Sequence, residues 1–335
     1  MRSTLVFIAS LIGCVITLIT ERLLGIDWDF HPDVVTYITT YKEVTQGGFA
    51  AMPNQLYFFI TDMVGGSLVL LIALNILAYC ITNVVMANAY SRFHRTRSNK
   101  HLPFILLVIL LISPYRIHLA VHALKDTLII FFLTFFVVYR GRTTYAWLSL
   151  FPLLLLRIYA SFYGLMLVRR RFLVMIVVMV ILLSALSDLS SIKDLLLERN
   201  EAAMHSRDFD AVPAFEDYGL LGTLLRMIVW PLFAVTGGYV LVSPALLFFP
   251  LAFEVVMMRA WCYRVFGHLG VTLGLLACLA VIAAVVNSFT AFIRYAYPAL
   301  AVMPFAILVE QAKVADAQRK VASRSRNYLL LIGQK

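Results

Sequence analysis

The sequence predicts an all-α, polytopic integral membrane protein with about ten transmembrane helices and half-helices. Apolar residues make up 62% of the chain and charged residues only 14%, and the mean hydropathy is +0.88. The apolar segments are too long for barrel strands, and Lys and Arg are concentrated in the short segments between them. This composition excludes a water-soluble globular protein.

The net charge of +10 follows from this topology. Most of the 28 Lys and Arg residues fall in short connecting segments and in the C-terminal tail, where cations mark the cytoplasmic side of a membrane. We therefore expect the lipid bilayer as a partner and no nucleic acid. The cysteines lie in apolar segments or beside a cytoplasmic turn, so no disulfide outside the membrane is expected; they are Cys14, Cys80, Cys262 and Cys278.

One transmembrane domain is predicted at 1–312, with external loops at 21–57 and 188–219, followed by a basic cytoplasmic tail at 313–335. The first apolar segment follows a single basic residue and continues unbroken past Cys14. It predicts a transmembrane helix with a cytoplasmic N-terminus, and a signal peptide is the alternative. The tail places the C-terminus in the cytoplasm as well.

A membrane hairpin is predicted at 103–139. Its two arms, Pro103 to Ile112 and Leu128 to Tyr139, are each shorter than the about 20 residues that cross the hydrocarbon. Basic segments flank both ends, so both ends are expected in the cytoplasm. Ionisable groups inside a membrane mark a functional site by default. The tip carries Tyr115, Arg116, His118, His122, Lys125 and Asp126.

A second hairpin is predicted at 145–168, between Arg140–Arg142 and Arg169–Arg171. Two half-helices that meet at 156–159 keep both basic clusters on the cytoplasmic side and bring Arg157 into the membrane. The alternative is a single helix in which the Arg157 side chain extends to the interface.

The other apolar segments alternate in direction across the bilayer. The segment at 220–238 is expected to be re-entrant or interfacial, because a full span there would place the basic tail outside. The remaining predictions are spans at 64–90, 171–187, 240–258 and 269–286, a short external turn at 287–298, and a last span ending at Val309.

Five basic residues lie within or beside apolar segments on the predicted outer side, where cations are disfavoured. The arginine guanidinium offers a fixed fork of donors that suits phosphate and keeps its charge when water is excluded. The five are therefore predicted to bind a diphosphate together, and pairing with lipid phosphates or loop carboxylates is the alternative for each. They are Arg116, Lys125, Arg157, Arg226 and Arg294.

The first external loop carries closely spaced carboxylates, which can hold a divalent cation or act as a general base. Asp33 is the predicted base, and Asp27 and Asp29 form the alternative cation site. His122 is a second candidate for the base. Its i, i+4 spacing from His118 is typical of two-histidine metal sites, but no glutamate lies between them in an HExxH pattern, so no metal is predicted there.

Three scattered elements carry a resemblance to a known family. They are Asp33-x3-Tyr37, the basic group Arg116, Lys125-Asp126 and Arg157, and Arg294-Tyr-Ala-Tyr297-Pro298 before the last span. In these positions, in length and in topology, the chain resembles the EpsG-like and Wzy-type polysaccharide polymerases, which make O-antigen or exopolysaccharide. It also resembles the wider C-type membrane glycosyltransferases with polyprenyl-linked donors.

The resemblance implies polymerisation of polyprenyl-diphosphate-linked repeat units, for example on undecaprenyl diphosphate, at the outer face of a bacterial inner membrane. It implies no cofactor, and a chain-length regulator as a further partner. Asp33 or His122 would activate the acceptor hydroxyl, and the basic residues would hold the diphosphate. The aromatic residues expected to stack on sugar rings are Tyr37, Tyr159, Trp230 and Tyr297, although an interfacial aromatic belt would give the same pattern.

Two other functions stay open. One is a monosaccharide transferase that uses a polyprenyl-phosphate sugar and a divalent cation at Asp27 and Asp29. The other is a flippase or another transporter of lipid-linked oligosaccharides, because broken helices with charges near the midplane are typical of transporters.

Overall fold

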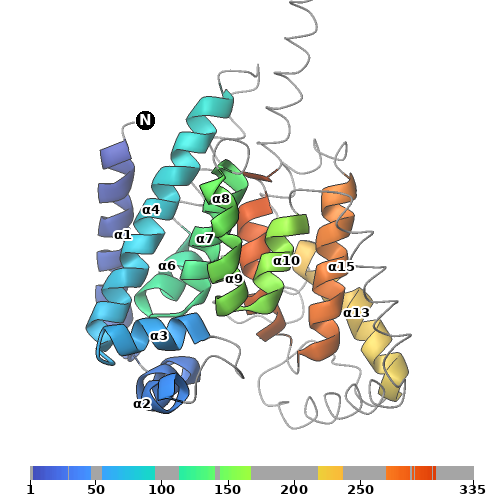
Figure 1. Cartoon of the computed structure of the whole chain (residues 1–335), viewed down its shortest axis with the longest axis horizontal. Coiled ribbons are helices and arrows are strands. Elements are labelled where there is room, and N and C mark those ends of the chain that lie inside the picture. Colours follow the sequence, from blue (N-terminus) through green and yellow to red (C-terminus); the bar gives the residue numbers. More distant parts are fainter. Residues whose placement is uncertain are drawn as a thin grey trace, which may run out of the picture.

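The computed structural model describes residues 3–28, 30–46, 55–94, 113–139, 144–166, 218–236, 269–286, 289, 291–303 and 305–306. Every regular element within these ranges is a helix, as the composition predicts (Figure 1). The predictions for the arm at 103–112, for the spans at 171–187 and 240–258, and for the tail fall outside these residues.

Two described helices are long and apolar enough to cross a membrane, namely α1 (Ser3–Leu23) and the part of α4 (Leu68–His94) that covers Leu68–Ser91. A third span is formed if the bent pair α6 (Pro114–Val121) and α7 (Asp126–Tyr139) counts as one. These apolar helices are compatible with a membrane protein. The larger number of about ten helices and half-helices stays a prediction.

Helices α1 and α4 pack along each other at one side of the molecule (Figure 1). Their contact includes small and polar residues: Cys14 is fully buried, and Asn83 donates a hydrogen bond to Ser10 Oγ at 3.0 Å. Small residues let helices in a membrane approach closely. The large apolar side chains of α1, such as Ile12 and Ile16, point outward instead. This arrangement suits a helix with one face toward lipid.

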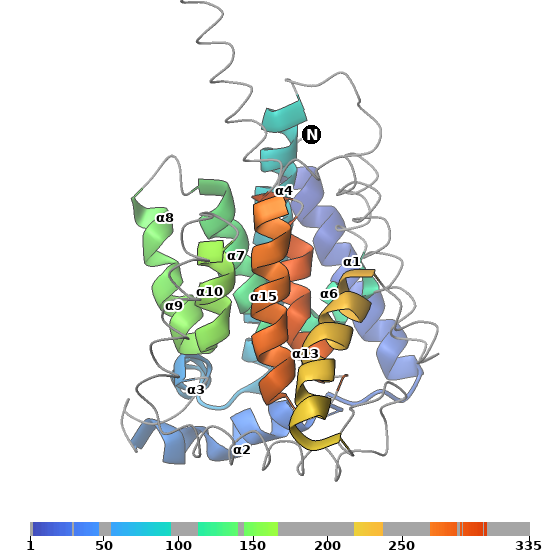
Figure 2. The same ribbon diagram turned by 90° about the vertical axis from the view of Figure 1, so that its right-hand side faces the viewer.

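Helix α2 (Pro32–Gln46) and the first three residues of α3 (Gln55–Met63) fall within the predicted external loop at 21–57. Figure 2 shows α2 lying across the lower ends of the upright helices. Val34, Tyr37 and Tyr41 form its buried face, at the i, i+3, i+7 spacing of an amphipathic helix. The first turn of α2 is thereby held against the bundle.

The tip of the first predicted hairpin is a sharp bend. The axes of α6 and α7 differ by 118°, and Ala123 between them has a φ of +51°, which is uncommon for a residue other than glycine. Side chains bind the backbone carbonyls that the bend exposes: the Tyr57 hydroxyl donates to the Ala123 oxygen, and Asn75 Nδ2 donates to the Leu124 oxygen at 3.0 Å. A broken helix inside a protein needs such partners.

The second predicted hairpin contains α8 (Tyr145–Leu148), α9 (Leu150–Leu156) and α10 (Ile158–Met166). The helix breaks at Arg157, whose φ of −161° and ψ of 127° are extended. Helices α9 and α10 pack side by side (Figure 2). This break is the one that the two-half-helix prediction requires, and the single-helix alternative does not fit it.

On the other side of the molecule, α13 (Gly219–Thr236) packs against α15 (Leu269–Val285). The prediction of a short external turn at 287–298 was wrong over much of its length, because a helix at Ala291–Met303 includes Arg294 and Pro298. Its side chains are largely buried, and a buried backbone satisfies its own polar groups best as a helix.

Candidate functional site

Arg294 joins two carboxylates that are far apart in the chain. Its Nε donates to Asp126 Oδ2 at 2.8 Å, and its Nη2 lies 2.8 Å from Asp33 Oδ2. The second contact is an ion pair by distance, without the alignment of a hydrogen bond. Asp126 is fully buried, whereas 41% of the Asp33 side chain is exposed. The group thus extends from the interior toward the surface.

Both carboxylates stand in the first turn of a helix, Asp33 in α2 and Asp126 in α7. The positive end of a helix dipole favours a negative side chain there. The bend between α6 and α7 turns the start of α7 into the bundle, and α2 brings Asp33 to the same place. Two helix starts therefore meet at one guanidinium.

Arg157 and Lys125 complete this charged group. The Arg157 guanidinium lies 3.8 Å from the centre of the Tyr295 ring and donates to the Tyr159 hydroxyl, and no described carboxylate lies within ion-pair distance of it. Lys125 is buried, with Nζ 5.4 Å from the centre of the Tyr37 ring. Aromatic faces stabilise cations without neutralising them.

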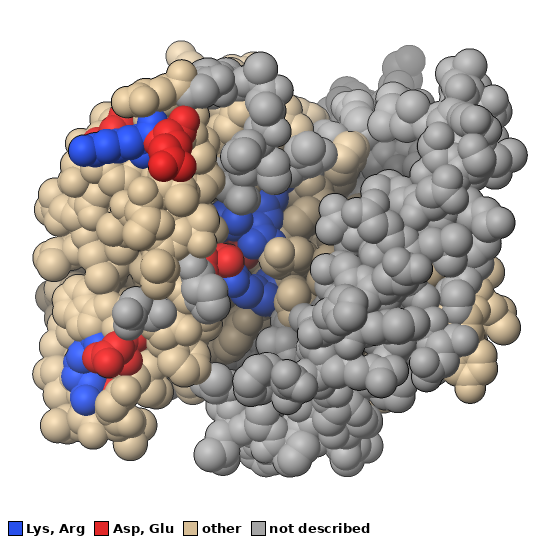
Figure 3. All heavy atoms as spheres, turned by 90° about the horizontal axis from the view of Figure 1, so that it is seen from below, with Lys and Arg blue, Asp and Glu red and all other residues tan. Residues whose placement is uncertain are grey.

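We call Asp33, Lys125, Asp126, Arg157 and Arg294 the central charge cluster. Its members interact electrostatically with one another, and it holds three basic groups against two carboxylates. Figure 3 shows basic and acidic atoms together in a hollow near the middle of the lower face. Such a group of charges within an apolar bundle can bind an anion, because the Arg157 guanidinium has no described carboxylate within ion-pair distance.

The other two predicted diphosphate residues lie elsewhere. Arg116 on α6 is turned toward α4, where Nη2 donates to Asn83 Oδ1 at 2.8 Å and the guanidinium lies 5.0 Å from the Tyr79 ring centre. Arg226 on α13 donates to the Ala284 oxygen at 3.2 Å. The structure brings together Lys125, Arg157 and Arg294 but neither of these two.

The four predicted glycan-stacking residues differ in their surroundings. Tyr159 is partly buried beside Arg157, and Tyr37 is buried under Lys125 with its ring against Tyr57. Trp230 is fully buried between Phe289 and Phe292, and Tyr297 is buried with its hydroxyl 3.1 Å from Ser113 Oγ; these last two have the contacts of core residues.

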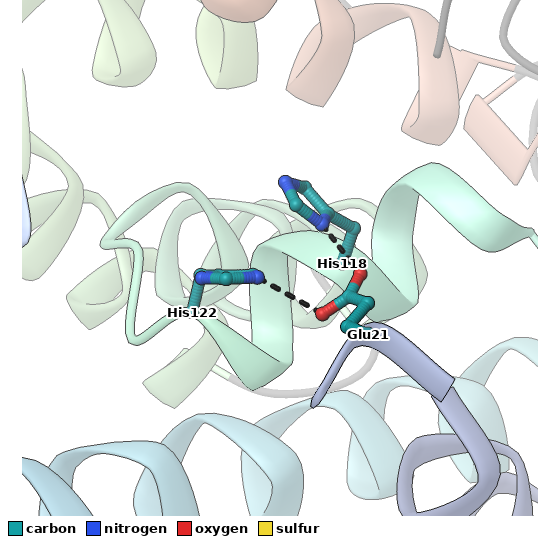
Figure 4. A group of neighbouring side chains, drawn as sticks. All are labelled: Glu21, His118 and His122. Carbon is teal, nitrogen blue, oxygen red and sulfur yellow. Dashed lines mark hydrogen bonds and ion pairs between the residues drawn. The ribbon is translucent and has the colours of Figure 1, made fainter. Parts of the chain in front are cut away.

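A second polar group adjoins the first. Glu21, in the last turn of α1, places its carboxylate between His118 of α6 and His122, which caps the C-terminal end of α6 (Figure 4). Glu21 Oε1 lies 2.7 Å from His118 Nδ1, and Oε2 lies 2.9 Å from His122 Nε2. Both histidines are buried, and their ring centres are 4.4 Å apart. The i, i+4 spacing places both on one helical face, as the sequence predicts.

His31 links this group to the central charge cluster. Its Nε2 lies 2.8 Å from His118 Nε2, and Asp33 follows two residues later. His31 is outside the membrane-spanning helices. Its burial, together with the nearby His118 and Arg294, lowers its pKa to about 3, so the ring is neutral at physiological pH. We call Glu21, His31, His118 and His122 the histidine–glutamate cluster.

Sequence analysis did not single out Glu21 or His31 as site residues. Glu21 stands where an apolar helix meets a loop, and carboxylates are common at such junctions. Its position in the last turn of the helix was the one sequence feature that pointed to a site. The alternative cation site is not assembled among the described residues: Asp27 pairs with Arg22 at 3.1 Å and its side chain is 82% exposed, and Asp29 is outside them.

No family model, no curated protein and no solved structure matches this chain.

Proposed function

We propose that the protein is a membrane glycosyltransferase that polymerises polyprenyl-diphosphate-linked oligosaccharide repeat units at the outer face of a bacterial inner membrane. The observation that carries this proposal is the meeting of Arg157, Lys125 and Arg294 beside the partly exposed Asp33. A diphosphate needs several cations, and the sugar attached to it needs a base nearby. The central charge cluster offers both.

In the proposed reaction, an acceptor hydroxyl attacks the anomeric carbon of the lipid-linked glycan. The new glycosidic bond forms there, and the bond from that carbon to the diphosphate oxygen breaks. The polyprenyl diphosphate leaves with the electron pair, and the hydroxyl proton passes to the Asp33 carboxylate. Arg157 and Lys125 stabilise the charge that develops on the leaving diphosphate, and donors held in place in an apolar site act strongly on such charge.

Arg294 has a different role in this proposal. It already contacts Asp126 and Asp33, so it orients Asp33 and sets the distance between the base and the other cations. Tyr159 and Tyr295 hold the Arg157 guanidinium from two directions. Of the predicted glycan-stacking residues, Tyr37 and Tyr159 lie beside this cluster, and the partly buried Tyr159 is the one of the four with ring surface that a sugar can reach.

The test uses purified protein in proteoliposomes with a polyprenyl-diphosphate-linked oligosaccharide, and the products are resolved by size. The wild type is expected to give a ladder of repeat lengths. Arg157→Ala is expected to abolish the ladder while insertion and size-exclusion behaviour stay normal, since no described carboxylate loses its partner. Lys42→Ala, an exposed basic residue of α2, is the matched control.

A ladder from Arg157→Ala like that of the wild type would contradict the role of Arg157. A single added sugar in place of a ladder would indicate the monosaccharide transferase, and movement of labelled lipid across the bilayer without a new glycosidic bond would indicate the flippase. Either result would overturn the proposed polymerase.

A further inference from the structure

The histidine–glutamate cluster has no part in the proposed transfer, yet it concentrates metal-ligating groups. Ligand atoms from Glu21, His118 and His122 all lie within 4.8 Å of one another. They come from two packed helices, α1 and α6, so the packing of the bundle holds them together. A pair of histidines one turn apart with a carboxylate from another element is a common donor set for transition metals.

The outer nitrogen of His118 has the partner that a metal ligand needs. A histidine that binds a metal through one nitrogen usually donates its other N–H to a nearby acceptor, which fixes the ring. With Nδ1 toward Glu21, His118 Nε2 faces His31 Nε2 at 2.8 Å. His31 Nε2 is therefore placed to accept a hydrogen bond from His118 Nε2.

His122 differs from His118 in its other ring nitrogen. Its side chain is 1% exposed, and its Nδ1 has no hydrogen-bond partner among the described residues. A buried nitrogen without a partner costs free energy whether Nε2 donates to Glu21 or binds a metal. Metal binding by Nε2 has to outweigh that cost, because no described residue fixes this ring from behind as His31 fixes that of His118.

The surroundings also suit a metal ion. The Phe30 ring lies against His31, His118 and His122, with ring centres 5.2, 6.4 and 6.2 Å away, and covers one side of the cluster. Exclusion of water strengthens charge interactions inside. The side chain of Glu21 is itself largely buried, and a bound cation would balance its charge.

We propose that Glu21, His118 and His122 bind one divalent transition-metal ion of the zinc class, with His31 as the positioning residue behind His118. Three protein ligands leave a fourth position for water or a substrate oxygen, as in catalytic zinc sites. The O···N separations of 2.7 and 2.9 Å are those of hydrogen bonds. Metal binding would replace the hydrogen-bonding protons, and the ligand atoms would move apart to about 3.3 Å, the spacing around a tetrahedral metal ion.

This inference is independent of the glycosyltransferase proposal, because its test reads metal content. Protein with a Strep tag and no polyhistidine is stripped with a chelator, equilibrated with buffered ZnCl₂ and separated from free metal, and zinc per chain is measured by mass spectrometry. The wild type is expected to hold about one zinc per chain. Glu21→Gln, His118→Ala and His122→Ala are each expected to lose it.

His94→Ala is the matched control, since His94 ends α4 at the end away from α2 (Figure 1), and it is expected to keep the zinc. His31→Ala is expected to keep the site but weaken zinc binding by about 10- to 100-fold. Co²⁺ gives a second readout that does not depend on the folding of a variant: cobalt-loaded wild type is expected to show visible absorption bands that excess Zn²⁺ removes.

Two results would overturn the proposal. One is a wild type that binds no more zinc than the triple variant Glu21→Gln/His118→Ala/His122→Ala and shows no cobalt bands, which would make the cluster a hydrogen-bond network only. The other is zinc retained by all three single variants, which would place the metal elsewhere.

Discussion

Arg294 and Asp126 form an ion pair in which Nε lies 2.8 Å from Oδ2 and the carboxylate is fully buried. The two residues are 168 positions apart and come from the helix at Ala291–Met303 and from α7. The pair therefore ties a late helix to the bend between α6 and α7, and it fixes the geometry of the central charge cluster.

Loss of Arg294 is expected to be severe. Arg294→Met leaves the buried Asp126 without the cation that donates a hydrogen bond to it, which should lower the free energy of unfolding by about 3–5 kcal/mol. Arg294→Met/Asp126→Asn should recover part of this loss, because the charge is removed together with its partner. Thermal unfolding in detergent measures both, and a double variant no more stable than the single one would contradict the explanation.

Asp33→Asn is expected to behave differently although it contacts the same guanidinium. Its side chain is 41% exposed, so solvent screens the pair, and the stability loss should be below about 1 kcal/mol. Under the proposed function the same substitution should abolish polymer formation. Unfolding and product analysis on one preparation separate the two effects, and a large loss of stability would show that Asp33 is a structural residue.

The shape of the Arg157 side chain is expected to matter as well as its charge. Arg157→Lys keeps the positive charge but loses the planar fork and the stacking on Tyr295. Product formation should fall at least about tenfold, a loss of about 1.4 kcal/mol in transition-state stabilisation. Initial rates in proteoliposomes test this, with Lys42→Arg as the control. Full activity of Arg157→Lys would mean that charge alone is sufficient.

The Tyr57 hydroxyl is one of two side-chain groups that hold the bend between α6 and α7. Tyr57→Phe removes the donor to the Ala123 carbonyl and leaves that oxygen buried, so stability should fall by about 1–3 kcal/mol. Tyr145→Phe is the matched control, because Tyr145 is 73% exposed and should be neutral. Equal unfolding temperatures for the two variants would show that the bend does not need this hydrogen bond.

Two neighbouring glycines between α3 and α4 allow a paired comparison. Gly65 and Gly66 both have positive φ, +63° and +73°, so alanine is strained at either position by about 1 kcal/mol. A Cβ at Gly66 would also lie 2.8 Å from Tyr41 Cε1, whereas a Cβ at Gly65 meets nothing within 4 Å. Gly66→Ala should therefore unfold at a lower temperature than Gly65→Ala, and the reverse order would contradict the close approach of Tyr41.

Features along the chain were predictable from the sequence to different degrees. The length and composition of the first apolar segment predict α1, and the break at Arg157 follows from basic clusters on both sides of a segment. These signals are local. The turn predicted at 287–298 was wrong over much of its length because Arg294 and Tyr297 suggested an exposed segment, while the structure pairs Arg294 with Asp126 of α7 and packs Tyr297 against Tyr115 of α6.

The candidate site was harder to predict because hydropathy gives the depth of a residue and not the side of the helix that it occupies. Arg116 and Arg157 look alike in sequence, yet one faces α4 and the other faces Tyr295. The meeting of Glu21 with His118 depends on how α1 packs on α6, a contact between residues 97 positions apart. Contacts between residues so far apart in the sequence are identified from the tertiary structure.

His31 and Asp33 lie two residues apart but contact different groups, His118 in one case and Arg294 in the other. The start of α2 is thus anchored at two points. A movement of the start of α2 would break both contacts together. The central charge cluster and the histidine–glutamate cluster are therefore coupled through residues 31–33. A ligand that separates Asp33 from Arg294 would also withdraw the acceptor behind His118.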